Sequence, residues 1–203
     1  MYKPLSRYVY GFHGCDQSIK DAILHQGSSF KISDNPYDWL GTGIYFWEND
    51  PVRAYEFADD ASRNPKQTKG SITNPAVIGA VIDLGHCCDL TKRENVAMLK
   101  IANETYLASV GGEDYAAKNK GKTEDRIGRF RDCAVINMLH EIIRVNPAYI
   151  PFDTVRSMFF EGDVIYPTSF FHEQTHIQIC VRNPNCIKAV FDPRTVDSSY
   201  PIP

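Results

Sequence analysis

The chain has 203 residues, of which 43% are apolar or aromatic, and this length and composition suit a single domain with one hydrophobic core. A net charge of −3 and an isoelectric point near 6.1 exclude a strong overall attraction to nucleic acid or to anionic membranes. The six cysteines form no CxxC pair, which favours reduced core residues over a zinc site or a disulfide framework. We expect one domain over residues 1–203, without a metal.

The first residues lack the basic and then apolar pattern of a secretory signal. No apolar run approaches the length needed to cross a bilayer. We therefore expect a cytoplasmic protein with no membrane partner.

The first quarter is expected to begin with a strand over residues 8–13 that runs directly into a helix. Asp16 is placed to cap the start of that helix, and Gly27 stands where a left-handed C-terminal cap is wanted. A polar loop and a glycine-rich strand follow. The pair Asp50-Pro51 then predicts the start of a second helix, which we expect to fray near Asn64-Pro65.

The middle of the chain begins with a β-branched run over residues 76–84, which predicts a buried strand. The capping-box spacing of Thr91 and Glu94 predicts a helix that ends before Gly111-Gly112. The next helix should bury apolar residues that repeat at helical spacing, namely Cys133, Ile136, Leu139 and Ile143. We interpret residues from about 91 to 147 as a helical insertion.

The last quarter reads as β structure, with strands expected over residues 154–160, 175–182 and 187–191. Turn-forming residues at 183–185 predict that the last two of these strands form a hairpin. The order of elements favours an α+β fold.

Two segments of the first half concentrate glycine, aromatic rings and a histidine. They are Phe12-His13-Gly14 and, about a helix later, Gly41-Thr42-Gly43-Ile44-Tyr45-Phe46. Glycine lets a backbone approach a flat ligand closely, and Tyr45 offers a flat π surface. The pattern suits a cleft at strand ends that binds an amide-bearing ring.

These segments resemble the N-terminal half of the diphtheria-toxin-like and poly(ADP-ribose)-polymerase-like ADP-ribosyltransferases. In that superfamily an apolar strand ends in His-Gly, a helix closes with an Ile-Leu-x-x-Gly-like phrase, and Gly-x-Gly-Ile-Tyr-Phe precedes the next helix. The middle phrase stands here as Ile23-Leu24-His25-Gln26-Gly27. The resemblance covers residues 10–58 and, more loosely, 154–192.

The resemblance implies an α+β fold with a split two-sheet β core, flanking helices and the helical insertion. It implies a mono-ADP-ribosyltransferase that uses NAD⁺ as substrate and releases nicotinamide. The macromolecular acceptor is expected to be a protein rather than a nucleic acid, because the basic stretch at 118–131 is interrupted by acidic residues and has little aromatic interleaving.

By the same resemblance, His13 would hydrogen-bond the ribose next to nicotinamide, Gly14 would pair with the carboxamide, and Tyr45 would stack on the pyridine ring. Gly43 and Phe46 are expected in the cofactor-binding segment around Tyr45.

The family's third catalytic residue, often a glutamate, belongs on a strand of the second half. In this chain Gln174, His176 and Gln178 alternate along one face of the predicted strand. We assign the third catalytic position to Gln178, with His176 beside it in the cofactor site, and keep Gln174 as the alternative. A glutamine cannot supply a carboxylate, which argues against chain elongation and for transfer of one ADP-ribose unit.

Four further charged residues are weaker candidates. Glu48 and Glu161 could supply a carboxylate, and Arg53 and Arg156 could contact the pyrophosphate. For each of them an ordinary surface or structural role is the competing interpretation.

Three other functions stay open. One is a non-catalytic module that binds NAD⁺ or ADP-ribose, which the absence of an assured glutamate favours. The others are an NAD⁺ glycohydrolase and a transferase that acts on a terminal RNA phosphate.

Overall fold

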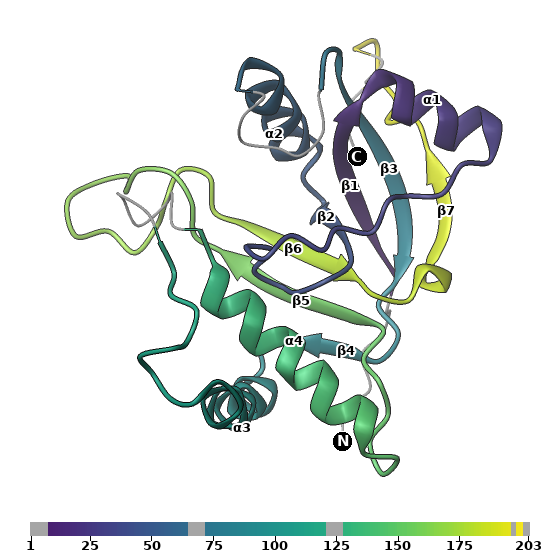
Figure 1. Ribbon diagram of the computed structural model, residues 1–203. Coiled ribbons are helices and arrows are strands. Elements are labelled where there is room, and N and C mark those ends of the chain that lie inside the picture. Colours follow the sequence, from purple (N-terminus) through teal and green to yellow (C-terminus); the bar gives the residue numbers. More distant parts are fainter. Residues whose placement is uncertain (1–7, 65–71, 121–127, 196–197, 201–203) are drawn as a thin grey trace.

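The computed structural model describes residues 8–64, 72–120, 128–195 and 198–200. In this part of the chain one mixed seven-stranded sheet is accompanied by four α-helices (Figure 1), so the α+β class is confirmed. The elements are, in chain order, β1 (Tyr8–Asp16), α1 (Gln17–Gln26), β2 (Ile44–Glu48), α2 (Pro51–Arg63), β3 (Pro75–Asp83), β4 (Cys87–Asp89), α3 (Arg93–Val110), α4 (Phe130–Val145), β5 (Thr154–Phe159), β6 (His176–Val181), the 3₁₀-helix η2 (Pro184–Cys186) and β7 (Ile187–Phe191).

The strands follow the order β4-β5-β6-β2-β1-β3-β7. The described strands thus form one hydrogen-bonded sheet, where two were expected. The junction between β1 and β2 is narrow, because the pairing consists of Gly11 with Glu48 and Phe12 with Trp47. On the two sides of this junction the strands run in clearly different directions (Figure 1). The expected split into two sheets therefore corresponds only to a place within one sheet where two residue pairs join β1 to β2.

Local capping signals predict the first two helices correctly. The Asp16 side chain accepts a hydrogen bond from the backbone N–H of Ser18 at 3.0 Å, and Gly27 ends α1 with a φ of 71°. The Asp50 side chain accepts from the N–H of Arg53 at 2.9 Å. Pro65, where α2 was expected to fray, lies outside the described residues, as do Lys122 and Arg126 of the basic stretch.

The predicted capping box of α3 is wrong. Lys92 stands at the N-cap without a side-chain capping bond, and the helix begins at Arg93. The hydroxyl of Thr91 instead donates to the carboxylate of Asp89 at 2.7 Å. Asp89 is the last residue of β4, a short strand that the sequence did not reveal. Because Thr91 bonds to Asp89, it forms a turn before the helix and does not cap it.

The predicted hairpin of the last two strands is also wrong. β6 lies between β5 and β2, whereas β7 pairs with β3 at the far end of the sheet. The chain changes direction at η2, where the Asn183 side chain accepts a hydrogen bond from Asn185 N and the Asn183 N–H donates to Asp153 O. A turn anchored to another segment need not return the chain to the preceding strand.

Two core clusters hold the sheet and its helices together. Helices α3 and α4 pack against one face through residues such as Ala102, Leu139 and Val155, with Tyr45 at the margin of the cluster. The four apolar residues predicted for α4 are all buried, which confirms that prediction. A second cluster joins β2 and β6 to β3 through residues that include Phe46 and Ile82. Consecutive residues of β2 therefore point into different environments.

All six cysteines are free, and five of them are buried. Their interpretation as residues that mostly belong to the core is confirmed. Among the described helices, none is both long enough and apolar enough to cross a bilayer.

Candidate functional site

A cavity of about 350 Å³ opens where β1, β2 and β6 lie side by side, and we call it the His13 cavity. It brings together three residues that the sequence singled out, His13 from β1, Tyr45 from β2 and Gln178 from β6. Its volume lies within the usual range for small-molecule sites. Six aromatic side chains contribute to its wall, namely Tyr37, Trp39, Tyr45, Trp47, Phe57 and Phe159.

His13 follows the point where β1 stops pairing with β2. Its Nδ1 lies 2.8 Å from the carbonyl oxygen of Tyr45, and its ring packs edge-on against Phe30. Burial lowers the pKa of His13, so the imidazole is held neutral. Because a carbonyl oxygen accepts, Nδ1 carries the proton and Nε2 is left as a hydrogen-bond acceptor.

Tyr45 presents its ring rather than its hydroxyl. The hydroxyl donates to the carbonyl oxygen of Gly41 at 2.7 Å and accepts from the N–H of Leu40 at 3.1 Å. Burial, the largest cause, raises the pKa of Tyr45. A phenol that is fixed and protonated in this way cannot serve as an acid or a base near neutral pH, which leaves stacking as its contribution to a ligand.

Gln178 lies opposite Trp47 of β2 and Ser157 of β5. Its side-chain oxygen Oε1 accepts a hydrogen bond from the indole N–H of Trp39 at 2.6 Å. Trp39 is itself packed against Phe159, with ring centres 4.8 Å apart. The bond fixes which way the amide points, so the Nε2 group of Gln178 is the end left for a ligand.

Of the three polar residues expected on one face, Gln178 alone lines the His13 cavity within the described structure. His176 is buried, with its Nδ1 at 2.7 Å from the carbonyl oxygen of Gln174, and burial lowers its pKa. Gln174 precedes β6, and its N–H donates to the carbonyl oxygen of Glu161. Between the two glutamines, the cavity favours Gln178.

Gly14, Gly43 and Phe46 do not line the cavity. A Cβ atom on Gly14 would collide with the carbonyl oxygen of Ala54 in α2, and one on Gly43 would collide with Cys180 in β6. Phe46 is fully buried in the core. The packing of the fold therefore accounts for these three residues without a ligand.

An ion pair at the cavity wall joins two of the weaker candidates. Arg53, which is 8% exposed, donates from Nε at 3.2 Å and from Nη2 at 2.7 Å to Oε2 of Glu161. Both residues line the His13 cavity. The sequence names both residues as candidates but does not reveal that they pair, because they lie 108 positions apart.

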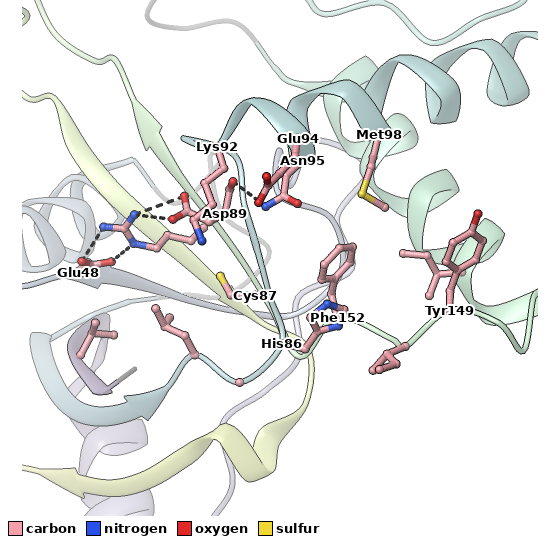
Figure 2. A pocket seen from close by; sticks show the side chains of 16 residues that line it. Glu48, His86, Cys87, Asp89, Lys92, Glu94, Asn95, Met98, Tyr149 and Phe152 are labelled. Atoms are coloured by element: carbon pink, nitrogen blue, oxygen red, sulfur yellow. Dashed lines mark hydrogen bonds and ion pairs between the residues drawn. The ribbon is translucent and has the colours of Figure 1, made fainter. Parts of the chain in front are cut away.

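The other two weaker candidates lie elsewhere. Glu48 and Arg156 line a larger cavity of about 810 Å³, which we call the Arg156 cavity (Figure 2). Arg156 donates to Glu48 from Nε at 2.5 Å and from Nη2 at 2.9 Å, and its Nη1 lies 3.4 Å from Asp89. The structure therefore does not bring Arg156 to the residues expected to bind NAD⁺.

Metal-binding side chains do not cluster in the described part of the chain, where no group of three or more His, Cys, Asp or Glu residues could hold an ion. Comparisons of the chain with protein-family models, with curated proteins and with solved structures find no match. The geometry of the His13 cavity is therefore the ground on which a function is proposed.

Proposed function

We propose that the protein is a mono-ADP-ribosyltransferase that moves one ADP-ribose unit from NAD⁺ to a macromolecular acceptor, a protein rather than a nucleic acid, and releases nicotinamide. The observation that carries this proposal is the meeting of His13, Tyr45 and Gln178 in one cavity, from three neighbouring strands. These are the three positions that the family resemblance assigns to the nicotinamide half of NAD⁺.

The chemistry of the three side chains supports this use. The Tyr45 ring suits stacking on a flat pyridinium, and Nε2 of His13 can accept a hydrogen bond from a ribose hydroxyl. The amide hydrogens of Gln178 can donate to a ribose oxygen, because its Oε1 is taken by Trp39. Such contacts would hold the ribose while the bond to nicotinamide breaks.

The side-chain amide of Gln178 also supports the transfer of a single ADP-ribose unit. Elongation of a chain requires the enzyme to activate a hydroxyl of the ADP-ribose already attached. At the position where the family resemblance places a glutamate, Gln178 offers neither a negative charge nor a basic group for that step. The expected product is therefore one ADP-ribose per acceptor site.

The test is to incubate purified protein with NAD⁺ and a cell lysate, and to measure released nicotinamide together with label from adenine-labelled NAD⁺. His13→Ala and Tyr45→Ala are expected to abolish both signals. His25→Ala and Tyr115→Ala are matched controls outside the His13 cavity and should keep both.

The outcomes separate the remaining functions. Binding of NAD⁺ without release of nicotinamide would identify a non-catalytic module. Release without incorporation of label would identify a glycohydrolase, and label in RNA or DNA would identify a nucleic acid as the acceptor. Label in protein that disappears in both cavity variants supports the proposal.

A further inference from the structure

The His13 cavity contains carboxylates that NAD⁺ binding does not explain. Among its described acidic residues, Asp38 holds its own loop together, since its Oδ2 accepts from Ser33 Oγ at 2.6 Å and from Asn35 N at 2.8 Å. Glu161 belongs to no such turn. It is the cavity carboxylate that remains to be assigned.

Glu161 lines the cavity where it borders the loop over residues 162–173. Ser157 of β5 lies directly opposite Gln178, and Glu161 follows it four residues further along, beyond the end of the strand. The backbone carbonyl of Glu161 accepts from Gln174 N at 3.0 Å, at the base of the loop over residues 162–173. If Gln178 holds the ribose, Glu161 lies on the loop side of it.

The carboxylate of Glu161 is held by hydrogen bonds but remains accessible from the cavity. Both hydrogen bonds from Arg53 end on Oε2 of Glu161, and Oε1 takes part in neither. The Glu161 side chain remains 24% exposed, whereas that of Arg53 is 9% exposed. Charge-assisted bonds to a buried guanidinium fix the orientation of a carboxylate, so Oε1 is presented in a defined place.

We propose that Glu161 is the general base of the transfer, and that the acceptor is a nucleophile that carries a proton. This inference rests on the proposed function. A hydroxyl, an amide or a guanidinium of a protein side chain can donate a hydrogen bond to Oε1 of Glu161. A carboxylate or a phosphate acceptor has no proton to give near neutral pH and is repelled by Glu161 and Asp38.

The step balances without a further reactant. The bond between C1′ of the ribose and the nicotinamide nitrogen breaks, and its electron pair leaves with the nicotinamide. A lone pair of the acceptor forms the new bond to C1′. The proton that the acceptor loses passes to Oε1 of Glu161 and then to water.

The experiment uses two substitutions of Glu161 and one matched control. Glu161→Gln keeps the shape but removes the base, and Glu161→Ala leaves room for a small carboxylate supplied as formate. Glu173→Gln makes the same charge change at an exposed position outside the cavity. The affinity for NAD⁺ is read from the fluorescence of the two tryptophans, both of which line the cavity.

We expect Glu161→Gln to bind NAD⁺ within about threefold of the wild type and to label protein about 100-fold more slowly, the usual size of a general-base effect. Formate should restore labelling by Glu161→Ala, which a purely structural role would not produce. Glu173→Gln should label normally. The attached label should survive a short treatment with neutral hydroxylamine, which cleaves esters of carboxylates rapidly.

Two results would overturn the inference while the proposed function stands. One is labelling by Glu161→Gln at the wild-type rate, and the other is label on carboxylate or phosphate groups. A wild-type protein that releases no nicotinamide would instead overturn the proposed function, and the inference with it.

Discussion

The indole N–H of Trp39 donates a hydrogen bond to the side-chain oxygen of Gln178 across 2.6 Å, although the two residues are 139 positions apart. The bond joins the loop before β2 to the middle of β6, and both side chains line the His13 cavity. It makes Trp39 the residue that sets the direction of the Gln178 amide. The two residues should therefore act as one unit in ligand binding.

Replacement of Trp39 by Phe tests this coupling. Trp39→Phe keeps a ring against Phe159 but loses the indole N–H that bonds to Gln178. A hydrogen bond contributes a net free energy of about 1 kcal/mol, so transition-state binding should weaken by about this amount. We expect kcat/KM for nicotinamide release to fall about fivefold. In a double-mutant cycle with Gln178→Ala, the two losses should be less than additive. Full additivity would show that Trp39 does not act through Gln178.

The sequence could predict what depends on neighbouring residues. Asp16, Gly27 and Asp50 were correctly placed as caps, because a cap acts on N–H or C=O groups a few residues away. The apolar periodicity of α4 was equally local. His13 and Tyr45 were singled out through a motif that spans two strands, and the structure brings both to one cavity.

What the sequence missed depends on distant parts of the chain. β4 has three residues and is a strand because β5 pairs with it, and the turn at Asn183 is redirected by Asp153. The link between Trp39 and Gln178 and the ion pair of Arg53 with Glu161 likewise join residues far apart in sequence. No local pattern contains such information.

Gly14 should tolerate no larger residue, for a reason of packing. In Gly14→Ala the new methyl group would collide with the carbonyl oxygen of Ala54, so α2 would have to move away from β1. We expect a loss of about 2 kcal/mol in the free energy of unfolding, measured in urea. Gly27→Ala has free space around its Cβ but a φ of 71°, and should lose about 1 kcal/mol. Equal losses in the two variants would contradict the close approach of α2.

The pair of Arg156 with Glu48 should contribute to stability and not to NAD⁺ binding. Their side chains are 17% and 10% exposed, so Glu48→Gln leaves a largely buried guanidinium with Asp89 as its remaining acidic partner. We expect a loss of about 3 kcal/mol in the free energy of unfolding, as is typical when one member of a buried pair is removed.

The same variant distinguishes the two cavities. Because Glu48 and Arg156 line the Arg156 cavity, the Kd for NAD⁺ of the folded variant should stay within about threefold of the wild-type value. Titration of tryptophan fluorescence with NAD⁺ measures this. A tenfold weaker affinity, in a variant that is still folded, would restore Arg156 as a residue that contacts the pyrophosphate.

His140 should make the fold sensitive to mild acid. Burial, followed by the nearby charge of Arg182, lowers the pKa of His140 to about 3 in the folded protein, against a usual value of about 6.5. At a pH between these two values, His140 is protonated in the unfolded chain but not in the folded protein. The free energy of unfolding therefore falls as the pH drops below about 6.5 and continues to fall toward pH 3.

Replacement of His140 by Gln removes its contribution to the pH dependence of the free energy of unfolding. The ring of His140 packs edge-on against Phe152, so the variant should be less stable than the wild type at pH 7.5. We expect its stability to decline less steeply between pH 6.5 and pH 4, as measured by urea unfolding at several pH values. His25→Gln, on the exposed surface of α1, should leave the wild-type slope unchanged. Parallel slopes for wild type and His140→Gln would show that His140 binds its proton equally well in the folded and unfolded states. The acid sensitivity would then come from other groups whose pKa values the fold lowers, such as His13, His176 and Asp16.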